Sequence, residues 1–276
     1  MTLNNNPFAN PEYPIREGLK IKDVKADASQ PVKKPVSDEK PVIATTSFSL
    51  EDIADCYRFS GVNLRGGVYT VDLAKKLLEN GARKTQEKWI EYSQKAVKQN
   101  GFVVGSAPLY HSLARILCKN KDSVDKMLVD KVKGFLQKTF VETFTMTLSR
   151  ISYLPKQDDV VKHNIGLADE YSLSGELVGA NGYILETAGS SEACELVIKD
   201  ENLQRVNDVY KWLTGKDTYL WRLNEKPVKL TERVVALGVC YNDRFYLDAD
   251  GYIDLNWPAL GVRVAKNISS GNRGSK

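Results

Sequence analysis

The stretch of residues 218–266 constrains the fold more than any other part of the chain, because it carries the densest β signal. Residues 234–239 and 260–264 are apolar runs of the length that strands have. Between them, Asp250-Gly251 has β-prone residues on both sides, which predicts a hairpin because both turn positions need positive φ. We therefore expect the end of the chain to be rich in antiparallel strands.

Composition sets the limits within which this stretch is interpreted. The chain has 276 residues, of which 42% are hydrophobic, so one large domain or two small ones with a sizeable core are expected. A formal net charge of +4 does not favour a nucleic-acid partner, since phosphate binding needs a clustered basic face. No apolar run approaches about 18 residues and no signal-peptide pattern is visible, which favours a cytoplasmic protein without a membrane span.

The four cysteines are far apart and contain no CxxC pair, so free thiols are favoured over a disulfide framework or a zinc site. They are Cys56, Cys118, Cys194 and Cys240. Residues 1–46 contain six prolines and few large apolar side chains, which predicts a disordered tail because little surface can be buried to offset the ordering entropy. The alternative is a docking arm that orders on a partner, with Phe8 and Tyr13 as anchors.

Residues 47–139 are predicted to be a helical region. Ser49 and Asp52 match a capping box that would open a short helix toward residue 59, and Thr70 is a cap candidate for a second helix. Trp89 and later apolar residues repeat at helical spacing up to about residue 99. Ser106, two residues before Pro108, predicts the start of another helix, and residues 123–137 form a further one with a mixed-charge face.

Residues 140–276 are predicted to be an α+β region, in which strands and helices are mixed. Phe144, Met146 and Leu148 alternate with threonines, which indicates a half-buried strand with a threonine-lined outer face. Strands are also expected at 171–178 and 183–186 around an Ala-Asn-Gly hairpin turn, and helices at 191–198 and 201–213. The chain should therefore be an α+β protein with a mostly antiparallel sheet, with the helices as a separate domain or part of one continuous domain.

The residues that carry metal or acid–base chemistry form no recognised catalytic motif. There is no GxSxG, HExxH or CxxC, and His111 is expected to be a hydrogen-bonded structural histidine. His163 lies near Asp158, Asp159 and Asp169 in the sequence, so a metal site there is one alternative to a polar loop. The aspartates of residues 248–254 allow a calcium site, although a β-turn with surface aspartates is favoured because two EF-hand positions are missing.

Three segments of the C-terminal stretch carry a resemblance to a known family. They are YLWR at 219–222, RVVALG at 233–238 and PALGVRVA at 258–265, the last after a run rich in Asn, Asp and Tyr. This order resembles the end of C-type-lectin-like domains of the formylglycine-generating-enzyme type. In prokaryotes and their phages, such domains are the usual targets of diversity-generating retroelements, which mutate adenines and so scatter Asn codons.

The resemblance implies a C-type-lectin-like fold and a variable ligand-binding surface, with Cys240 among the variable positions. Tyr, Trp, Asn and Asp suit such a surface because aromatic rings give contact area at low entropy cost and amides and carboxylates give adaptable hydrogen bonds. The ligand contacts it implies are Tyr241, Asn242, Asp243, Phe245, Tyr246, Asp248, Asp250, Tyr252, Asp254, Asn256 and Trp257.

Three functions remain open from the sequence. The favoured one is a non-enzymatic binding protein without a cofactor, in which the helices mount a C-terminal surface that binds a protein or other ligand. The second is a structural or assembly protein of a phage or mobile element, which would form oligomers. The third is a divalent-metal-dependent hydrolase that uses the acidic residues.

Overall fold

A computed structural model describes residues 47–122, 125–240 and 243–266 of the chain. The predicted tail at 1–46 and the predicted ligand contacts Tyr241 and Asn242 lie outside these residues. The helices are η1 (Leu78–Gly81), α1 (Gln86–Lys98), α2 (Ala107–Lys119), α3 (Lys126–Glu142), α4 (Ser190–Ile198) and α5 (Leu203–Thr214). The described residues all belong to one compact unit.

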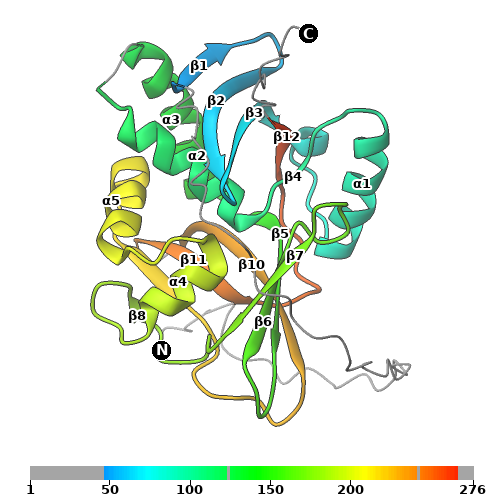
Figure 1. The fold of residues 1–276 in the computed structure, drawn as a ribbon, viewed down its shortest axis with the longest axis vertical. Coiled ribbons are helices and arrows are strands. Elements are labelled where there is room, and N and C mark those ends of the chain that lie inside the picture. The colour runs from blue at the N-terminus through cyan, green and yellow to red at the C-terminus, as the bar shows by residue number, and fades with distance from the viewer. Residues whose placement is uncertain (1–46, 123–124, 241–242, 267–276) are drawn as a thin grey trace, which may run out of the picture. The chain divides into compact units, whose positions relative to one another are not determined.

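Strands in the described residues form two sheets (Figure 1). One is built from β1 (Ser49–Asp52), β2 (Cys56–Leu64), β3 (Gly67–Leu77), β4 (Val103–Val104) and β12 (Leu260–Lys266), in the order β1-β2-β3-β12-β4. The other is built from β5 (Thr145–Tyr153), β6 (Asp159–His163), β7 (Tyr171–Gly175), β8 (Gly182–Tyr183), β9 (Thr218–Trp221), β10 (Thr231–Cys240) and β11 (Arg244–Gly251). Its order is β7-β6-β5-β10-β11-β9-β8.

The strand pairings confirm the predicted α+β class with mostly antiparallel sheets. Within the described residues only β11 and β9 pair in parallel, and every other named pair is antiparallel. Among the same residues, no helix is long and apolar enough to cross a membrane. Cys56, Cys118 and Cys194 are free thiols, as expected for them.

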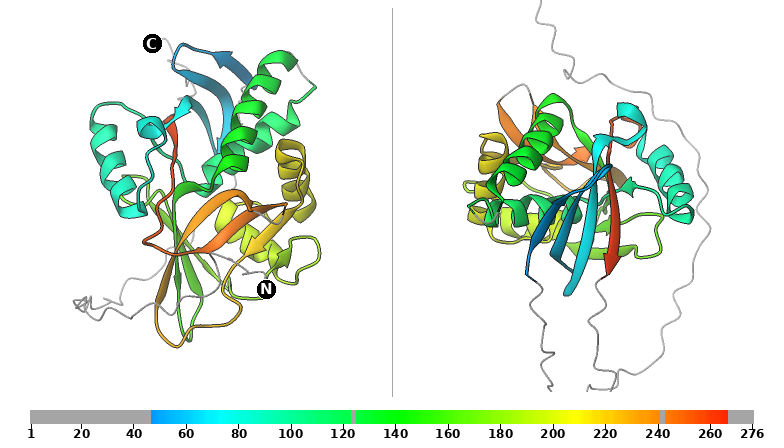
Figure 2. Two further views of the ribbon diagram at one scale, coloured as in Figure 1. Left: turned by 180° about the vertical axis from the view of Figure 1, so that it is seen from behind. Right: turned by 90° about the horizontal axis from the view of Figure 1, so that it is seen from above.

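The helices predicted near residues 49–59 and 70–78 are wrong, because β1, β2 and β3 occupy this part of the chain. Asp72 explains the error: it lies opposite Arg58 on β2 and Arg263 on β12, and pairs with both. In sequence these charged residues resemble the polar face of a helix, but in the fold they lie on one face of a sheet. Contacts with distant strands therefore override the local helical pattern. Figure 2 shows this sheet, in blue, cyan and red, packed against the green helices α2 and α3.

Helices α1 to α5 agree with the helices expected from helical spacing, within a few residues at their ends. Trp89 and Ala96 of α1 are buried, and Gly215 ends α5 with a φ of 77°. Helix α2 lies between the two sheets, while α3, α4 and α5 cover one face of the seven-stranded sheet and α1 lies against the other (Figure 1).

Both faces of the seven-stranded sheet are therefore covered over its centre. Leu237 and Phe245 face the larger core with α3 and α5, whereas Met146 and Ala236 face a second core with Trp89 of α1. The predicted strand at 143–148 is confirmed in kind as β5, but its threonine side is not an outer face. Thr145 and Thr147 are fully buried, because helices pack on that side too.

Two predicted hairpins are wrong. Strand β11 continues through Asp250 and Gly251, and its partner β10 precedes it in the chain. Neither Asp250 nor Gly251 has the positive φ that the predicted turn needs, whereas Asp243, at the start of β11, has a φ of 62°. The Ala-Asn-Gly hairpin also fails, since β7 pairs with β6 and β8 pairs with β9.

Candidate functional site

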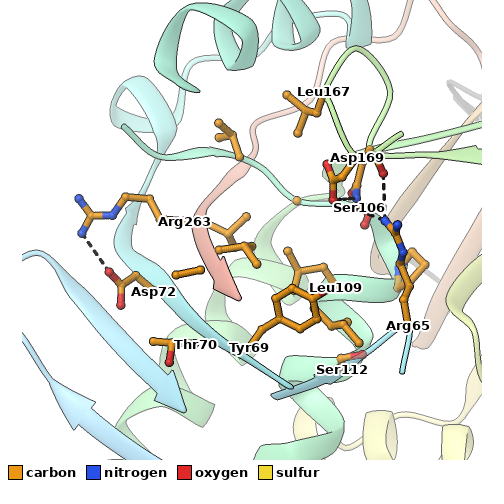
Figure 3. A pocket seen from close by; sticks show the side chains of 18 of the residues that line it. Arg65, Tyr69, Thr70, Asp72, Ser106, Leu109, Ser112, Leu167, Asp169 and Arg263 are labelled. Atoms are coloured by element: carbon orange, nitrogen blue, oxygen red, sulfur yellow. Dashed lines mark hydrogen bonds and ion pairs between the residues drawn. The ribbon is translucent and has the colours of Figure 1, made fainter. Parts of the chain in front are cut away.

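A cleft of about 1010 Å³ runs along α2 (Figure 3). Its walls are the first three turns of α2, the β2–β3 hairpin, strands β4 and β12, the end of α1 and the loop at 164–171. Figure 3 shows the Arg65–Asp169 pair and the Arg263–Asp72 pair at opposite sides of the cleft. The volume is that of a site for a drug-sized ligand or a short segment.

The start of α2 is held in place by four hydrogen bonds. The hydroxyl of Tyr110 accepts a bond from the backbone N of Gly105 at 2.8 Å and donates one to the carbonyl O of Leu260 at 2.7 Å. The backbone N of Ala107 donates to Ser149 Oγ at 3.0 Å, and the N of Tyr110 closes the first turn on Ser106 O. Position 105 has to be glycine, since a Cβ there would lie 2.7 Å from the Tyr110 ring.

Ser106 occupies the N-cap position of α2, as the sequence predicted, but its side chain makes no cap hydrogen bond. It is 3% exposed and lines the cleft, and no partner for its hydroxyl is found in the described part of the chain. Ser112, two turns further on, also lines the cleft. These hydroxyls give the cleft wall hydrogen-bonding capacity beside the apolar side chain of Leu109.

Basic side chains surround this wall. Arg65 donates to the carbonyl O of Asp169 at 2.9 Å, and its guanidinium lies 4.3 Å from the ring centroid of Tyr171. Arg115 and Lys199 also line the cleft, and Asp169 is the acidic side chain on this side. Each of these cations pairs with a carboxylate: Arg65 with Asp169, Arg115 with Asp200 and Lys199 with Glu195. Of these carboxylates Asp169 alone lines the cleft, so an anion in the cleft is favoured electrostatically.

A second polar chain lies behind the start of α2. His163 Nε2–H donates to the carbonyl O of Leu196 at 2.9 Å, since a carbonyl oxygen can only accept. In the neutral ring Nδ1 is then the acceptor, and Ser149 O–H donates to it at 2.7 Å while Ser149 Oγ accepts the Ala107 bond. Burial is the main cause that lowers the pKa of His163 to about 4, which keeps the ring neutral. His163 is therefore a buried link between α2, β5 and α4.

The structure does not support the metal site considered around His163. Asp159 accepts bonds from the backbone N of Leu154 and Leu177 and pairs with Lys226 at 2.8 Å, whereas Asp169 pairs with Arg65 and Asn164. Over residues 47–122, 125–240 and 243–266 no group of three or more His, Cys, Asp or Glu side chains could hold a metal ion.

His111 is buried beneath the cleft and hydrogen-bonded, as expected for a structural histidine. Its Nε2 lies 3.0 Å from Asp200 Oδ2 and its Nδ1 lies 3.2 Å from the hydroxyl of Tyr210. Asp200 also accepts bonds from Arg205 and pairs with Arg115 at 3.5 Å, so the carboxylate links the cleft wall to α5. Burial lowers the pKa of His111 more strongly than Asp200 raises it.

The predicted C-terminal ligand surface divides by the two-residue period of β11. Phe245 is fully buried in the larger core, which corrects its prediction as a ligand contact. Trp257 is a core residue too: it is 8% exposed, and its carbonyl O accepts a bond from Trp89 Nε1 at 2.8 Å. Asp243, Tyr252, Asp254 and Asn256 are exposed.

Tyr246, Asp248 and Asp250 lie on the other face of β11, on a surface that we call the aromatic face. It is formed by Tyr246 with Tyr183 of β8 and Tyr219 and Trp221 of β9, and neighbouring rings have centroids 5.3–6.2 Å apart. Arg244 lies over the rings of Tyr183 and Tyr219. Tyr246 itself is only 6% exposed, so the face consists largely of rings packed on each other.

Partial burial raises the pKa of Asp248 to about 7, and Asp250 pairs with Arg233 at 2.6 Å. Asp250 is thus engaged by a cation of the protein, and Asp248 Oδ1 accepts a bond from the backbone N of Asp250. Asp248 and Asp250, two of the three aspartates considered for calcium, therefore already have protein partners, whereas Asp254 is exposed.

From the sequence, Ser106 was predicted only as the start of a helix. The predicted site residues did not include Arg65, Arg115 or Lys199. No local pattern marks them: Arg65 and Asp169 are 104 positions apart and meet only through the fold. Comparison of the chain with protein-family models, curated proteins and solved structures found no match. Any function therefore has to be argued from the geometry of the cleft.

Proposed function

We propose that this chain is a non-enzymatic binding protein that holds a small anionic ligand in the cleft along α2. The observation that carries this proposal is the wall itself: Arg65, Arg115 and Lys199 line the same cleft as Ser106, whose hydroxyl makes no bond to the helix. A cavity of this size with a few polar groups in an otherwise apolar lining is typical of a ligand site. The excess of cations selects for negative charge.

The two histidines support binding rather than proton transfer in the cleft. His111 and His163 are both buried, and each ring nitrogen has a protein partner. They hold α2 against α5, β5 and α4, and so fix the position of the wall that the ligand contacts. A wall fixed before binding costs less conformational entropy when the ligand arrives.

The proposal is tested with three small anions: citrate, tripolyphosphate and ATP. Binding is followed by the backbone amide shifts of the ¹⁵N-labelled protein, and we expect shifts concentrated at α2, the β2–β3 hairpin and the loop at 164–171. Arg65→Asn removes the charge at a φ of 50° that asparagine tolerates, so it should weaken binding without loss of the fold.

Lys138→Gln on α3 is the matched control, because Lys138 is exposed and does not line the cleft. It should leave the affinity unchanged. The proposal is overturned when none of the three anions shifts the amides of the cleft, or when Lys138→Gln weakens binding as much as Arg65→Asn does.

A second candidate is the diversified lectin-like binder that the resemblance implies. It is favoured by one observation: Tyr252, Ile253 and Leu255 are exposed apolar side chains between β11 and β12, next to Asp254 and Asn256. Diversification would concentrate substitutions there and spare the buried Phe245 and Trp257. Sequencing the gene in closely related isolates tests this, and substitutions spread evenly over residues 240–257 would count against it.

A further inference from the structure

The first turn of α2 has an open cap. Of its backbone N–H groups, that of Ala107 is bonded to Ser149 Oγ, and Pro108 has none. The N–H of Leu109 has no partner among the described residues. This is the group that an N-cap side chain ordinarily satisfies.

Two other helices, α3 and α5, have the side-chain cap that α2 lacks, whereas α1 and α4 also have none. In α3 the side chain of Asp125 accepts a bond from Leu128 N at 3.0 Å, and in α5 the side chain of Asn202 accepts one from Arg205 N at 2.9 Å. Ser106 is as good a cap residue as either, but its hydroxyl does not bond to the helix.

Ser106 is the second, independent observation that indicates a ligand here. Its hydroxyl makes no cap bond and lines the cleft, so its hydrogen-bonding capacity is available to a ligand there. Ser106 is 97% buried, which corresponds to its exposure of 3%, and the small accessible part lies on the cleft. The N–H of Leu109 can only donate and the hydroxyl can donate, so one group that bonds to both is an acceptor.

Charge specifies the acceptor further. The thirteen-residue helix α2 presents the positive end of its dipole to the cleft, and Arg65 and Arg115 line the same cavity. We propose that an oxyanion group of the ligand, phosphate or carboxylate, caps α2 by accepting hydrogen bonds from Leu109 N–H and Ser106 O–H. This proposal rests on the proposed function and adds to it the position and the chemistry of the contact.

The test uses inorganic phosphate and acetate as separate probes, each titrated into the ¹⁵N-labelled full chain. We expect the Leu109 amide to shift with at least one of them, and the stronger binder identifies the oxyanion class. Ser106→Ala should weaken that binding about tenfold, because one hydrogen bond to a charged group is lost. Melting of Ser106→Ala should be unchanged, since the hydroxyl has no protein partner.

Thr85→Ala is the matched control. Thr85 holds the N-cap position of α1, another thirteen-residue helix, also without a side-chain cap bond, but it does not line the cleft. It should leave phosphate and acetate affinity unchanged. An undisturbed Leu109 amide with both probes overturns the proposal, as does equal affinity of Ser106→Ala and the wild type.

The two proposals fail in different ways. When citrate, tripolyphosphate or ATP shifts amides of the β2–β3 hairpin and the 164–171 loop while Leu109 stays unchanged, the cleft binds anions and only the cap contact is wrong. When no cleft amide responds to any probe, both proposals are wrong. The Leu109 amide is also a readout in the wild type, so the test does not depend on how a variant folds.

Discussion

The cleft along α2 and the aromatic face of the seven-stranded sheet differ in what their polar and aromatic groups already contact. On the aromatic face, Arg244 lies over Tyr183 and Tyr219, although its buried Nε has no hydrogen-bond partner among the described residues, and Arg233 pairs with Asp250. In the cleft, the hydroxyl of Ser106 and the N–H of Leu109 have no partner in the part of the chain that the structure describes. A surface rich in Tyr and Asp is thus not by itself a binding surface. A group without a protein partner indicates a ligand where it also lines a cleft, as Ser106 and Leu109 do and Arg244 does not.

The largest effect is expected at the buried carboxylate beneath the cleft. Asp200→Asn should lower the free energy of unfolding by about 3 kcal/mol, because a buried carboxylate that binds His111 and Arg205 loses its charge. Asp250→Asn on the aromatic face should cost about 1 kcal/mol, since Asp250 and Arg233 are partly exposed. Urea denaturation of both variants measures the difference.

Equal losses in the two variants would mean that the network beneath the cleft is no more essential to the fold than a surface pair. In that case the cleft wall is held by packing, and the argument that the wall is fixed before a ligand binds would lose its main support.

Tyr246 and Tyr252 were both predicted to contact a ligand, but they differ in burial, so substituting each one tests whether the aromatic face is packed core or free surface. Tyr246→Ala should lower the free energy of unfolding by about 2–3 kcal/mol, since its ring is 6% exposed and packs against Tyr219 and Phe144. Tyr252→Ala should cost less than about 0.5 kcal/mol, because Tyr252 is 53% exposed. Thermal and urea denaturation check both values.

A small loss for Tyr246→Ala would show that the aromatic rings contribute little to the core. The aromatic face would then regain the role of a surface kept for a ligand, and the contrast with the cleft would fail.

The helices were predictable because each buries one face at a spacing that the sequence shows directly. Trp89 and Ala96 in α1, and Leu109 and Leu113 in α2, repeat at helical intervals and are buried. A strand was also predicted where β11 lies, but its end was placed too early. The Asp-Gly pattern predicts a turn from local sequence alone, whereas Gly251 pairs with Val234 on the neighbouring strand.

The strands at 49–77 and the cleft were beyond local patterns. Asp72 is part of a strand because Arg58 and Arg263 flank it, and Arg263 is 191 positions away. Likewise, Ser106 is recognisable as a cap from the sequence, but its lack of a bond to the helix follows only from the three-dimensional structure. Sequence reasoning can name residue types for a site, whereas unsatisfied groups are a property of the fold.

A change of pH should affect the stability of the two regions with opposite sign. The pKa of His163 is near 4 in the folded chain and about 6.5 when unfolded, so its contribution to stability is lost as the pH falls from 6.5 toward 4. The pKa of Asp248 is near 7 when folded and 3.8 when unfolded, so its contribution is lost as the pH rises through that interval.

Two variants separate these contributions. The loss of unfolding free energy caused by His163→Gln should be about 2 kcal/mol smaller at pH 5 than at pH 8. The reason is that the wild type loses, in acid, the stability that its neutral histidine contributes, whereas the variant has no such contribution to lose. The free energy of unfolding of Asp248→Asn, relative to that of the wild type, should be about 1 kcal/mol higher at pH 8 than at pH 5. This value is reduced because the carboxyl is partly exposed. Urea denaturation at the two pH values measures both, and parallel shifts of the two variants would contradict the opposition. The region behind the cleft would then be no more sensitive to acid than the aromatic face, and His163 would not be the buried neutral link that positions α2.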